Sequence, residues 1–218
     1  MSAGFVPQKE LVSIISVLEP KEGSTTDEIL NVILRAQEEY PKIPGLIAYS
    51  ILKATNGTKV VPYSIYEQGL DLNEVLTSTT SVVAPIWAEL ESISERSVTQ
   101  YDTVDLYVNE GATLELVEGL VLTLSLFNTP DTENQEEALS HIRGHLKATA
   151  GDIYGLKGGI LLKSVDGIKI AILCYWDNEE VILEALQDGR FDTLRTRLAD
   201  SVSEIQKEVL IVHHIATV

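Results

Sequence analysis

The sequence has a single cysteine, little positive charge and no long apolar run, and each scarcity excludes a class of protein. Cys174 is the only cysteine among 218 residues, so the chain forms no internal disulfide and a reducing compartment fits best. The apolar runs are too short to span a bilayer, and the first ten residues lack the basic start and apolar core of a secretion signal. These absences predict a cytoplasmic protein without a membrane-spanning segment.

Positive charge is scarce along the whole chain. The 16 lysines and arginines face 33 aspartates and glutamates, which gives a net charge of −17. The two halves of the sequence share this excess almost equally, so it belongs to the general surface rather than to an acidic tail. Such a surface repels phosphate groups, which excludes nucleic acid and anionic membrane as expected partners. Its simplest role is solubility.

What the sequence does contain is an internal repeat. Residues 45–60, GLIAYSILKATNGTKV, correspond to residues 155–170, GLKGGILLKSVDGIKI, with six of sixteen positions identical and an offset of 110 residues. This offset is half the chain length, so the sequence predicts one module present twice. Asn56-Gly57 and Asp166-Gly167 occupy the same place in both copies, and both dipeptides favour the tight turn of a β-hairpin.

The order of apolar patterns in each module predicts β-α-β-β-α-β. In the first module, Thr26, Asp27 and Glu28 indicate the start of a helix. In the second module, the spacing of Leu139, Ile142 and Leu146 indicates the corresponding helix. The first module is expected to have strands at 11–18, 46–52, 59–66 and 97–106, with a second helical region at 81–93. The second is expected to have strands at 120–127, 157–163, 169–176 and 208–216, with helical segments at 179–186 and 191–198.

This order predicts an α+β fold of two tandem ferredoxin-like repeats, at residues 9–108 and 114–218. Successive apolar residues such as Ile170, Ala171, Ile172 and Leu173 make both faces of the strands apolar. Helices cover only one face of a ferredoxin-like sheet, so the other face needs an apolar partner. We therefore expect the two sheets to pack face to face as an intramolecular pseudo-dimer.

The second module, from Gly155 to Phe191, resembles the antibiotic biosynthesis monooxygenase-like (ABM) domains of the dimeric α+β barrel type. The resemblance covers most of residues 114–218 and extends more weakly to 9–107 through the repeat. Family members usually dimerise, so the tandem chain resembles that dimer made covalent, and further homodimerisation is left open. The resemblance implies a pocket between each sheet and its own helices.

The activity that the resemblance implies is that of a cofactor-independent monooxygenase acting on an aromatic polyketide-type small molecule of secondary metabolism. In such oxygenases the electron-rich substrate itself gives an electron to dioxygen, and the protein supplies orientation and desolvation. Two alternatives share the barrel: a polyketide cyclase or decarboxylase, and a non-catalytic small-molecule-binding protein. Residues 182–198 lack the Trp and His that the haem-degrading branch requires.

Trp176 and His145 are the candidate catalytic residues, which favours the second module as the active one. Trp176 matches the family's strand-ending Trp, although the family's hydrogen-bonding Asn four residues earlier is replaced by Ile172. The first module has Tyr66 and Pro62 at these positions, and we expect Pro62 to interrupt an inner strand. His145 lies beside the apolar stripe of its helix and has the ordinary pKa range of a general base.

The candidate substrate-binding residues are Tyr66, Arg35, Tyr175, Trp87 and His213. Each has a simpler interpretation as a core or surface residue. Arg35 occupies the place of His145 in the first module, and His213 is adjacent to His214, so the two should face opposite sides of a strand. His141 and His145 are spaced for a shared metal, but no third ligand is evident, so neither a metal nor a cofactor is expected.

Overall fold

The computed structural model describes residues 5–8, 10–69, 84–187 and 189–217, and its elements follow the predicted order. The expected helix 81–93 begins at Ala84 within the described residues, and 81–83 lie outside them. The first half contains β1 (Val12–Pro20), α1 (Thr26–Arg35), the short turn η1 (Tyr40–Lys42), β2 (Leu46–Ala54), β3 (Val60–Tyr66), α3 (Ala84–Ile93) and β4 (Ser94–Val108). The second half contains β5 (Val121–Asn128), α4 (Thr132–Thr149), η2 (Ala150–Asp152), β6 (Leu156–Ser164), β7 (Lys169–Trp176), α5 (Glu179–Gln187), α6 (Arg190–Leu198) and β8 (Glu204–Thr217).

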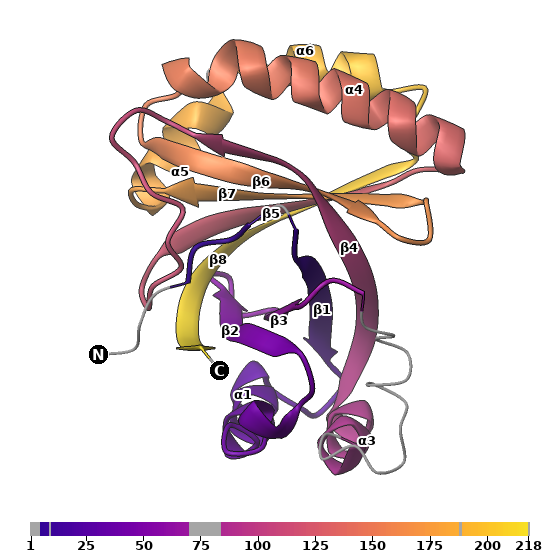
Figure 1. Ribbon diagram of the computed structural model, residues 1–218, viewed down its shortest axis with the longest axis vertical. Helices are drawn as coiled ribbons and strands as arrows, with labels where there is room; N and C mark the ends of the chain where they lie inside the picture. The colour runs from indigo at the N-terminus through magenta and orange to yellow at the C-terminus, as the bar shows by residue number, and fades with distance from the viewer. Residues whose placement is uncertain (1–4, 9, 70–83, 188, 218) are drawn as a thin grey trace.

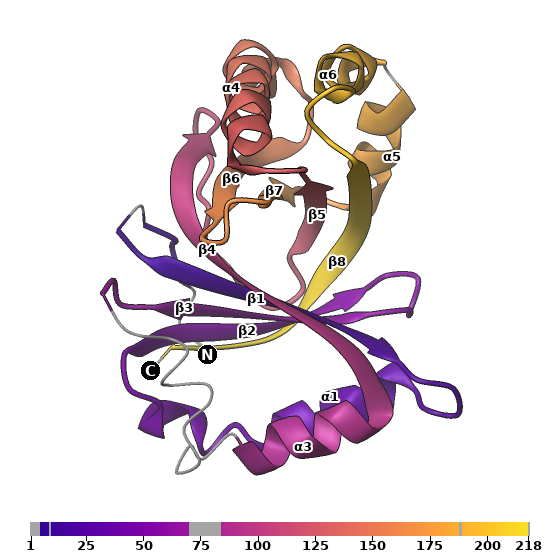
Figure 2. The same ribbon diagram turned by 90° about the vertical axis from the view of Figure 1, so that its right-hand side faces the viewer.

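The eight strands form one closed barrel in the order β1-β3-β2-β8-β5-β7-β6-β4. Strands β4 and β8, of 15 and 14 residues, run across both halves (Figures 1 and 2). The first part of β4 pairs with β1 and its second part with β6, while β8 pairs first with β5 and then with β2. The expected face-to-face packing of two sheets takes the form of one closed barrel, because β4 and β8 belong to both sheets. Closure leaves no unpaired strand edge, which two open sheets would have.

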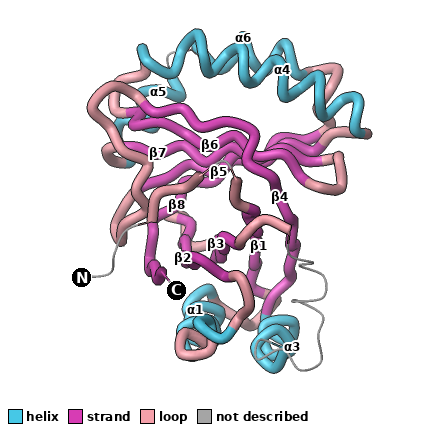
Figure 3. Tube along the Cα trace, in the orientation of Figure 1, coloured by secondary structure: helices cyan, strands magenta, loops and turns pink. Residues whose placement is uncertain are grey.

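The α+β barrel itself is confirmed, and it explains why the strands are apolar on both faces. Ala171 and Leu173 point into the barrel, where they meet Ile15 and Tyr63 of the first half. Ile170 points outward against the helices of its own half. Helices α1 and α3 cover the first half, and α4, α5 and α6 cover the second (Figures 2 and 3). The division of the chain into two domains and its origin by duplication stay predictions.

Local signals in the sequence set the turns. Gly57 and Gly167 adopt φ values of 72° and 81°, as the predicted hairpin turns require. Gly158 has a φ of 154°, and a Cβ added there would lie 2.1 Å from the Tyr107 carbonyl oxygen of β4. Glycine thus allows β6 to approach β4. Helix α1 is capped by Thr25, whose side chain accepts from the Glu28 amide, rather than by the expected residues 26–28.

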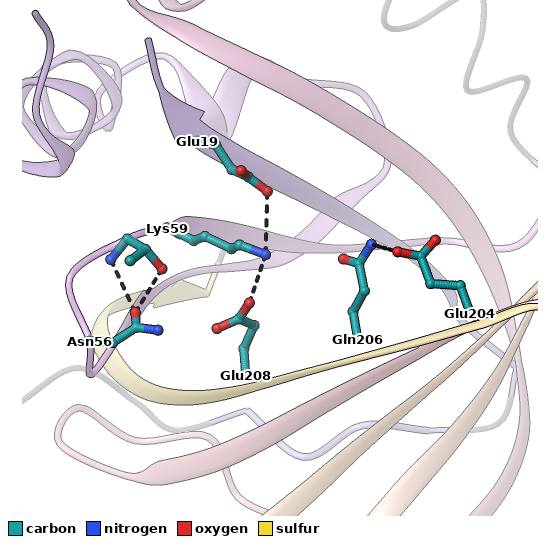
Figure 4. A network of polar contacts seen from close by, with 7 residues as sticks. Glu19, Asn56, Lys59, Glu204, Gln206 and Glu208 are labelled. Atoms are coloured by element: carbon teal, nitrogen blue, oxygen red, sulfur yellow. Dashed lines mark hydrogen bonds and ion pairs between the residues drawn. The ribbon is translucent and has the colours of Figure 1, made fainter. Parts of the chain in front are cut away.

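A lysine that is identical in the two repeated segments ties each hairpin to a long strand of the other half. Lys59 Nζ contacts Glu208 Oε1 on β8 at 2.6 Å and Glu19 Oε1 on β1 at 3.3 Å (Figure 4). Its counterpart Lys169 donates to Thr99 Oγ1 on β4 at 3.1 Å. Burial alone would lower the pKa of Lys59, but Glu208 and Glu19 raise it above its ordinary value. Lys59 is therefore charged and joins the two halves.

We predict that Lys59→Met lowers the free energy of unfolding by about 1–3 kcal/mol, because it leaves the largely buried Glu208 without its cation. The matched control is Lys53→Met, which removes an exposed ion pair with Asp27 and should cost less than about 1 kcal/mol. Urea unfolding followed by circular dichroism measures both. Equal small losses in the two variants would contradict the structural role of Lys59.

Candidate functional site

A cavity of about 480 Å³ lies in the first half, between the outer face of the sheet and helices α1 and α3. Its floor comes from β1, β2, β3 and β4, and its roof from Ile33 of α1 and Ile86, Trp87 and Leu90 of α3. Most of this lining is apolar. The polar groups that line it are Ser16, Tyr40, Tyr49, Ser64, Tyr66, Glu91, Arg96 and Gln100.

The sheet register places these floor residues on one face. Gln100 of β4 is paired with Ile14 of β1, Ile14 with Ser64 of β3, and Ser64 with Tyr49 of β2. Paired residues in neighbouring strands point to the same side of a sheet, so this row faces the helices. The row carries three polar side chains across four strands, and they are separated widely in the sequence.

Pro62 also lines the cavity, and it does not end its strand. Strand β3 runs continuously through Pro62, which is paired with Ile51 of β2. The pairing of β3 with β1 is present at Ile15–Tyr63 and Leu18–Val60 but not between them. The expected interruption is therefore confined to this stretch of one ladder, because proline has no N–H to donate there.

Three tyrosines lie at one end of the cavity. The rings of Tyr40 and Tyr49 are 4.2 Å apart between centroids and tilted by 32°. Burial raises the pKa of Tyr40 and of Tyr66 to about 12, and raises that of Tyr49 well above its ordinary value. All three phenols are therefore neutral near pH 7. The phenols of Tyr49 and Tyr66 can donate hydrogen bonds to a ligand oxygen, whereas the Tyr40 hydroxyl donates to the Ile33 carbonyl oxygen at 3.4 Å. None of the three can act as a base.

A cation also lines the cavity. The Arg96 guanidinium is 4.7 Å from the ring centroid of Trp87, and its Nη2 donates to Glu91 Oε1 at 3.1 Å. The stacking and the ion pair both hold the guanidinium against α3. The cavity thus has neutral phenols at one end and a positive charge on an indole at the other.

Of the predicted site residues, only Tyr66 and Trp87 line this cavity. Arg35 lies on the exposed side of α1 and forms an ion pair with Glu89 of α3. Tyr175 points into the barrel, where its hydroxyl has no hydrogen-bond partner among the described residues. His213 is exposed on β8, and a register shift in the pairing with β2 falls at this residue. The structure does not bring these three to the cavity.

Trp176 and His145 lie in the second half, which sequence reasoning had favoured as the active one. Trp176 is 2% exposed, and its Nε1 donates to Thr123 Oγ1 at 3.0 Å. His145 is buried on α4; burial lowers its pKa, and Nε2 has no hydrogen-bond partner among the described residues. Neither residue is part of the cavity lining. Their proposed catalytic roles are untested by this geometry.

The cavity is in the first half because the two halves fill the space under their helices differently. Trp176 takes the place of Tyr66, and Val181, Ile182 and Ala185 of α5 pack against it. In the first half, α3 has Leu90 as its only fully buried residue. Tyr49 corresponds to Gly159 in the repeat, and this difference between the two halves could have pointed to Tyr49 as a site residue. The sequence contains no comparable signal for Arg96.

Within the described parts of the chain, no three His, Cys, Asp or Glu side chains are arranged to hold a metal ion. None of the described helices is both long and apolar enough to cross a membrane. The thiol of Cys174 lies between the apolar clusters of the second half, and burial raises its pKa to about 11.

Comparison with solved structures identifies the fold. No protein-family model matches the chain, and no curated protein matches it either. An anthrone oxidase-like protein superposes with a TM-score of 0.78 at 13% identity, covering 98% of this chain and 96% of its own. A ferredoxin-fold protein from Listeria monocytogenes, described as related to antibiotic biosynthesis monooxygenases, gives 0.52 at 10% identity, covering 95% and 96%. The fold is that of the ABM-like proteins.

A third similar structure shows that this ABM-like fold is not confined to proteins named as oxygenases. A major regulator of staphylococcal pathogenesis superposes with a TM-score of 0.54 at 11% identity, covering 92% of this chain and 99% of that one. Identities this low establish the fold alone. The chemistry of the chain has to be argued from its cavity.

We predict that Trp176→Phe lowers the free energy of unfolding by about 1–3 kcal/mol, because it removes a buried hydrogen bond and leaves a void. Trp87→Phe is the matched control, since Trp87 is only partly buried, and it should cost less than about 1 kcal/mol. Denaturant unfolding of the two variants measures the difference. A larger loss for Trp87→Phe would mean that the core of the second half does not depend on Trp176.

Proposed function

We propose that the chain is a cofactor-independent monooxygenase-like enzyme that binds an aromatic polyketide-type molecule in the cavity of its first half. The observation that carries the proposal is the cavity itself: apolar walls, with three neutral phenols at one end. The ABM-like fold and the resemblance of the sequence support the reaction type. We further propose that the two halves arose by duplication, as the repeat at residues 45–60 and 155–170 suggests.

The reaction that suits this cavity is oxidation of an anthrone-type ring by dioxygen. The ring CH2 loses two hydrogens and gains one oxygen atom as a carbonyl, and the other oxygen leaves with the two hydrogens as water. The substrate loses a CH2 proton to solvent water, and the resulting conjugate base supplies the first electron to dioxygen. Phenols that donate hydrogen bonds to the substrate oxyanion favour this base, and apolar walls exclude competing water.

Each part of the cavity has a distinct role in this proposal. Tyr66 donates a hydrogen bond to the oxygen of the substrate, and Trp87 covers its ring from α3. Arg96 places a positive charge beside Trp87, where an acidic substituent would lie. The original candidates Trp176 and His145 would instead place the reaction in the second half, so variants of both halves are needed.

The test is oxygen uptake with 1,8-dihydroxyanthrone, using protein treated with a chelator and an oxygen electrode. Ser64→Leu fills the middle of the cavity floor, and we expect it to lower the enzymatic rate at least about tenfold. Tyr66→Phe should lower it as well, through the lost hydrogen bond. His145→Gln and Trp176→Phe are the controls in the second half and should keep most of the activity. The opposite pattern would move the site to the second half.

A non-catalytic small-molecule-binding protein is the second candidate. Its support is that the cavity lining contains, among the described residues, no histidine and a single carboxylate, Glu91, which is paired with Arg96. Among the described residues, this lining offers a cyclase or decarboxylase only Glu91 as an acid–base residue, since His145 lies elsewhere. A rise in melting temperature with 1,8-dihydroxyanthrone, without oxygen uptake or product, would favour binding over catalysis.

A further inference from the structure

We infer that the Tyr49 hydroxyl recognises a carbonyl or phenolate oxygen on the ligand, and so fixes which end of the ligand lies against the tyrosines of the cavity. The inference rests on the proposed function in that it uses the same cavity. It goes further by naming the recognising residue and the chemical group that the ligand must present there.

Tyr49 combines burial with an unused hydrogen-bonding group. Tyr49 is 3% exposed and lines the cavity. Its hydroxyl has no hydrogen-bond partner among the described residues. The nearby Tyr40 hydroxyl donates to the Ile33 carbonyl oxygen at 3.4 Å instead. A buried hydroxyl without a partner destabilises a protein, so its presence beside a cavity points to a partner that arrives with the ligand.

The protonation state of Tyr49 determines what that partner is. Burial first, and then the charge and hydrogen-bonding influence of the nearby Tyr40 hydroxyl, raise the pKa of Tyr49 well above its ordinary value. The Tyr40 hydroxyl itself is outside hydrogen-bonding geometry with Tyr49. The phenol therefore keeps its proton and can donate it in a hydrogen bond. A ligand oxygen that accepts, such as a ketone or a phenolate, gains from this contact, whereas a ring that presents only C–H groups leaves the hydroxyl unpaired.

The second half supports the assignment by contrast. The position of Tyr49 in the repeat is taken there by Gly159, and a Cβ at Gly159 would already lie 3.1 Å from the Leu173 carbonyl oxygen and 3.4 Å from Cys174 Sγ. Any side chain at that position would require these neighbours to shift. The phenol thus occurs in the half that has the cavity, and glycine occurs in the half that is filled.

Two matched probes test the inference without requiring any reaction: 1-tetralone, which has a ketone, and tetralin, which has a CH2 in its place. The protein is the Trp176→Phe variant, in which Trp87 is the single tryptophan and reports occupancy of the cavity by fluorescence. The measured quantity is the ratio of the two dissociation constants. We expect Tyr49→Phe to reduce the preference for 1-tetralone about tenfold, as the loss of one buried hydrogen bond implies.

Tyr40→Phe is the matched control, because it removes a phenol of the same cavity whose hydroxyl already has a protein partner. It should leave the ratio within about twofold. An unchanged ratio in Tyr49→Phe, an equal drop in Tyr40→Phe, or failure of both probes to bind overturns the inference. The binding test consumes no oxygen, so it is independent of the oxygen-uptake test. If Tyr49→Phe changes the ratio as expected but the protein does not oxidise the anthrone, the proposed reaction is rejected and the ligand site is retained.

A measurement on protein with Tyr49 intact keeps the inference testable if Tyr49→Phe does not fold. The infrared carbonyl stretch of bound 1-tetralone should lie below its frequency in an apolar solvent, because a phenol donates to it. A bound carbonyl at the apolar-solvent frequency would overturn the inference. If the variant folds, its melting temperature without ligand should equal or exceed that of the parent, since an unpaired hydroxyl has been removed.

Discussion

The structure depends on the hydrogen bonding of two long strands that serve both halves of the chain. Strands β4 and β8 each continue from the sheet of one half into the sheet of the other, so the eight strands close without a free edge. This closure turns the inner faces of both halves into one apolar core and fixes the helices outside. The largely buried ion pair of Lys59 with Glu208 also ties the β2–β3 hairpin to β8.

Closure also explains why one half can lose packing and gain a cavity. The barrel interior is stabilised by residues of both halves, so the outer face of either sheet need not be filled completely for the barrel to form. In the second half, Trp176 and the helices α5 and α6 fill that face. In the first half, tyrosines and apolar side chains surround a cavity, which the proposed aromatic ligand would occupy.

The sequence predicted the parts of the fold that depend on neighbouring residues. Asn56-Gly57 and Asp166-Gly167 set the hairpin turns through their backbone preferences, and the apolar alternation set the strands. It did not predict that the two sheets share strands, because a local pattern of residues does not show that a strand continues from one sheet into the next. It identified Tyr66 and Trp87 of the cavity lining but missed Tyr49, and it favoured the half that proved to be filled.

The sequence by itself determined the repeat, the β-α-β-β-α-β order and an acidic surface, since each follows from residue type and spacing along the chain. Only the tertiary structure decided where the cavity lies and which hydroxyl in it has no partner. A cavity is the space left between side chains of distant elements, here Tyr49 of β2, Ser64 of β3 and Trp87 of α3. Its volume depends on how those side chains pack, which no single segment specifies.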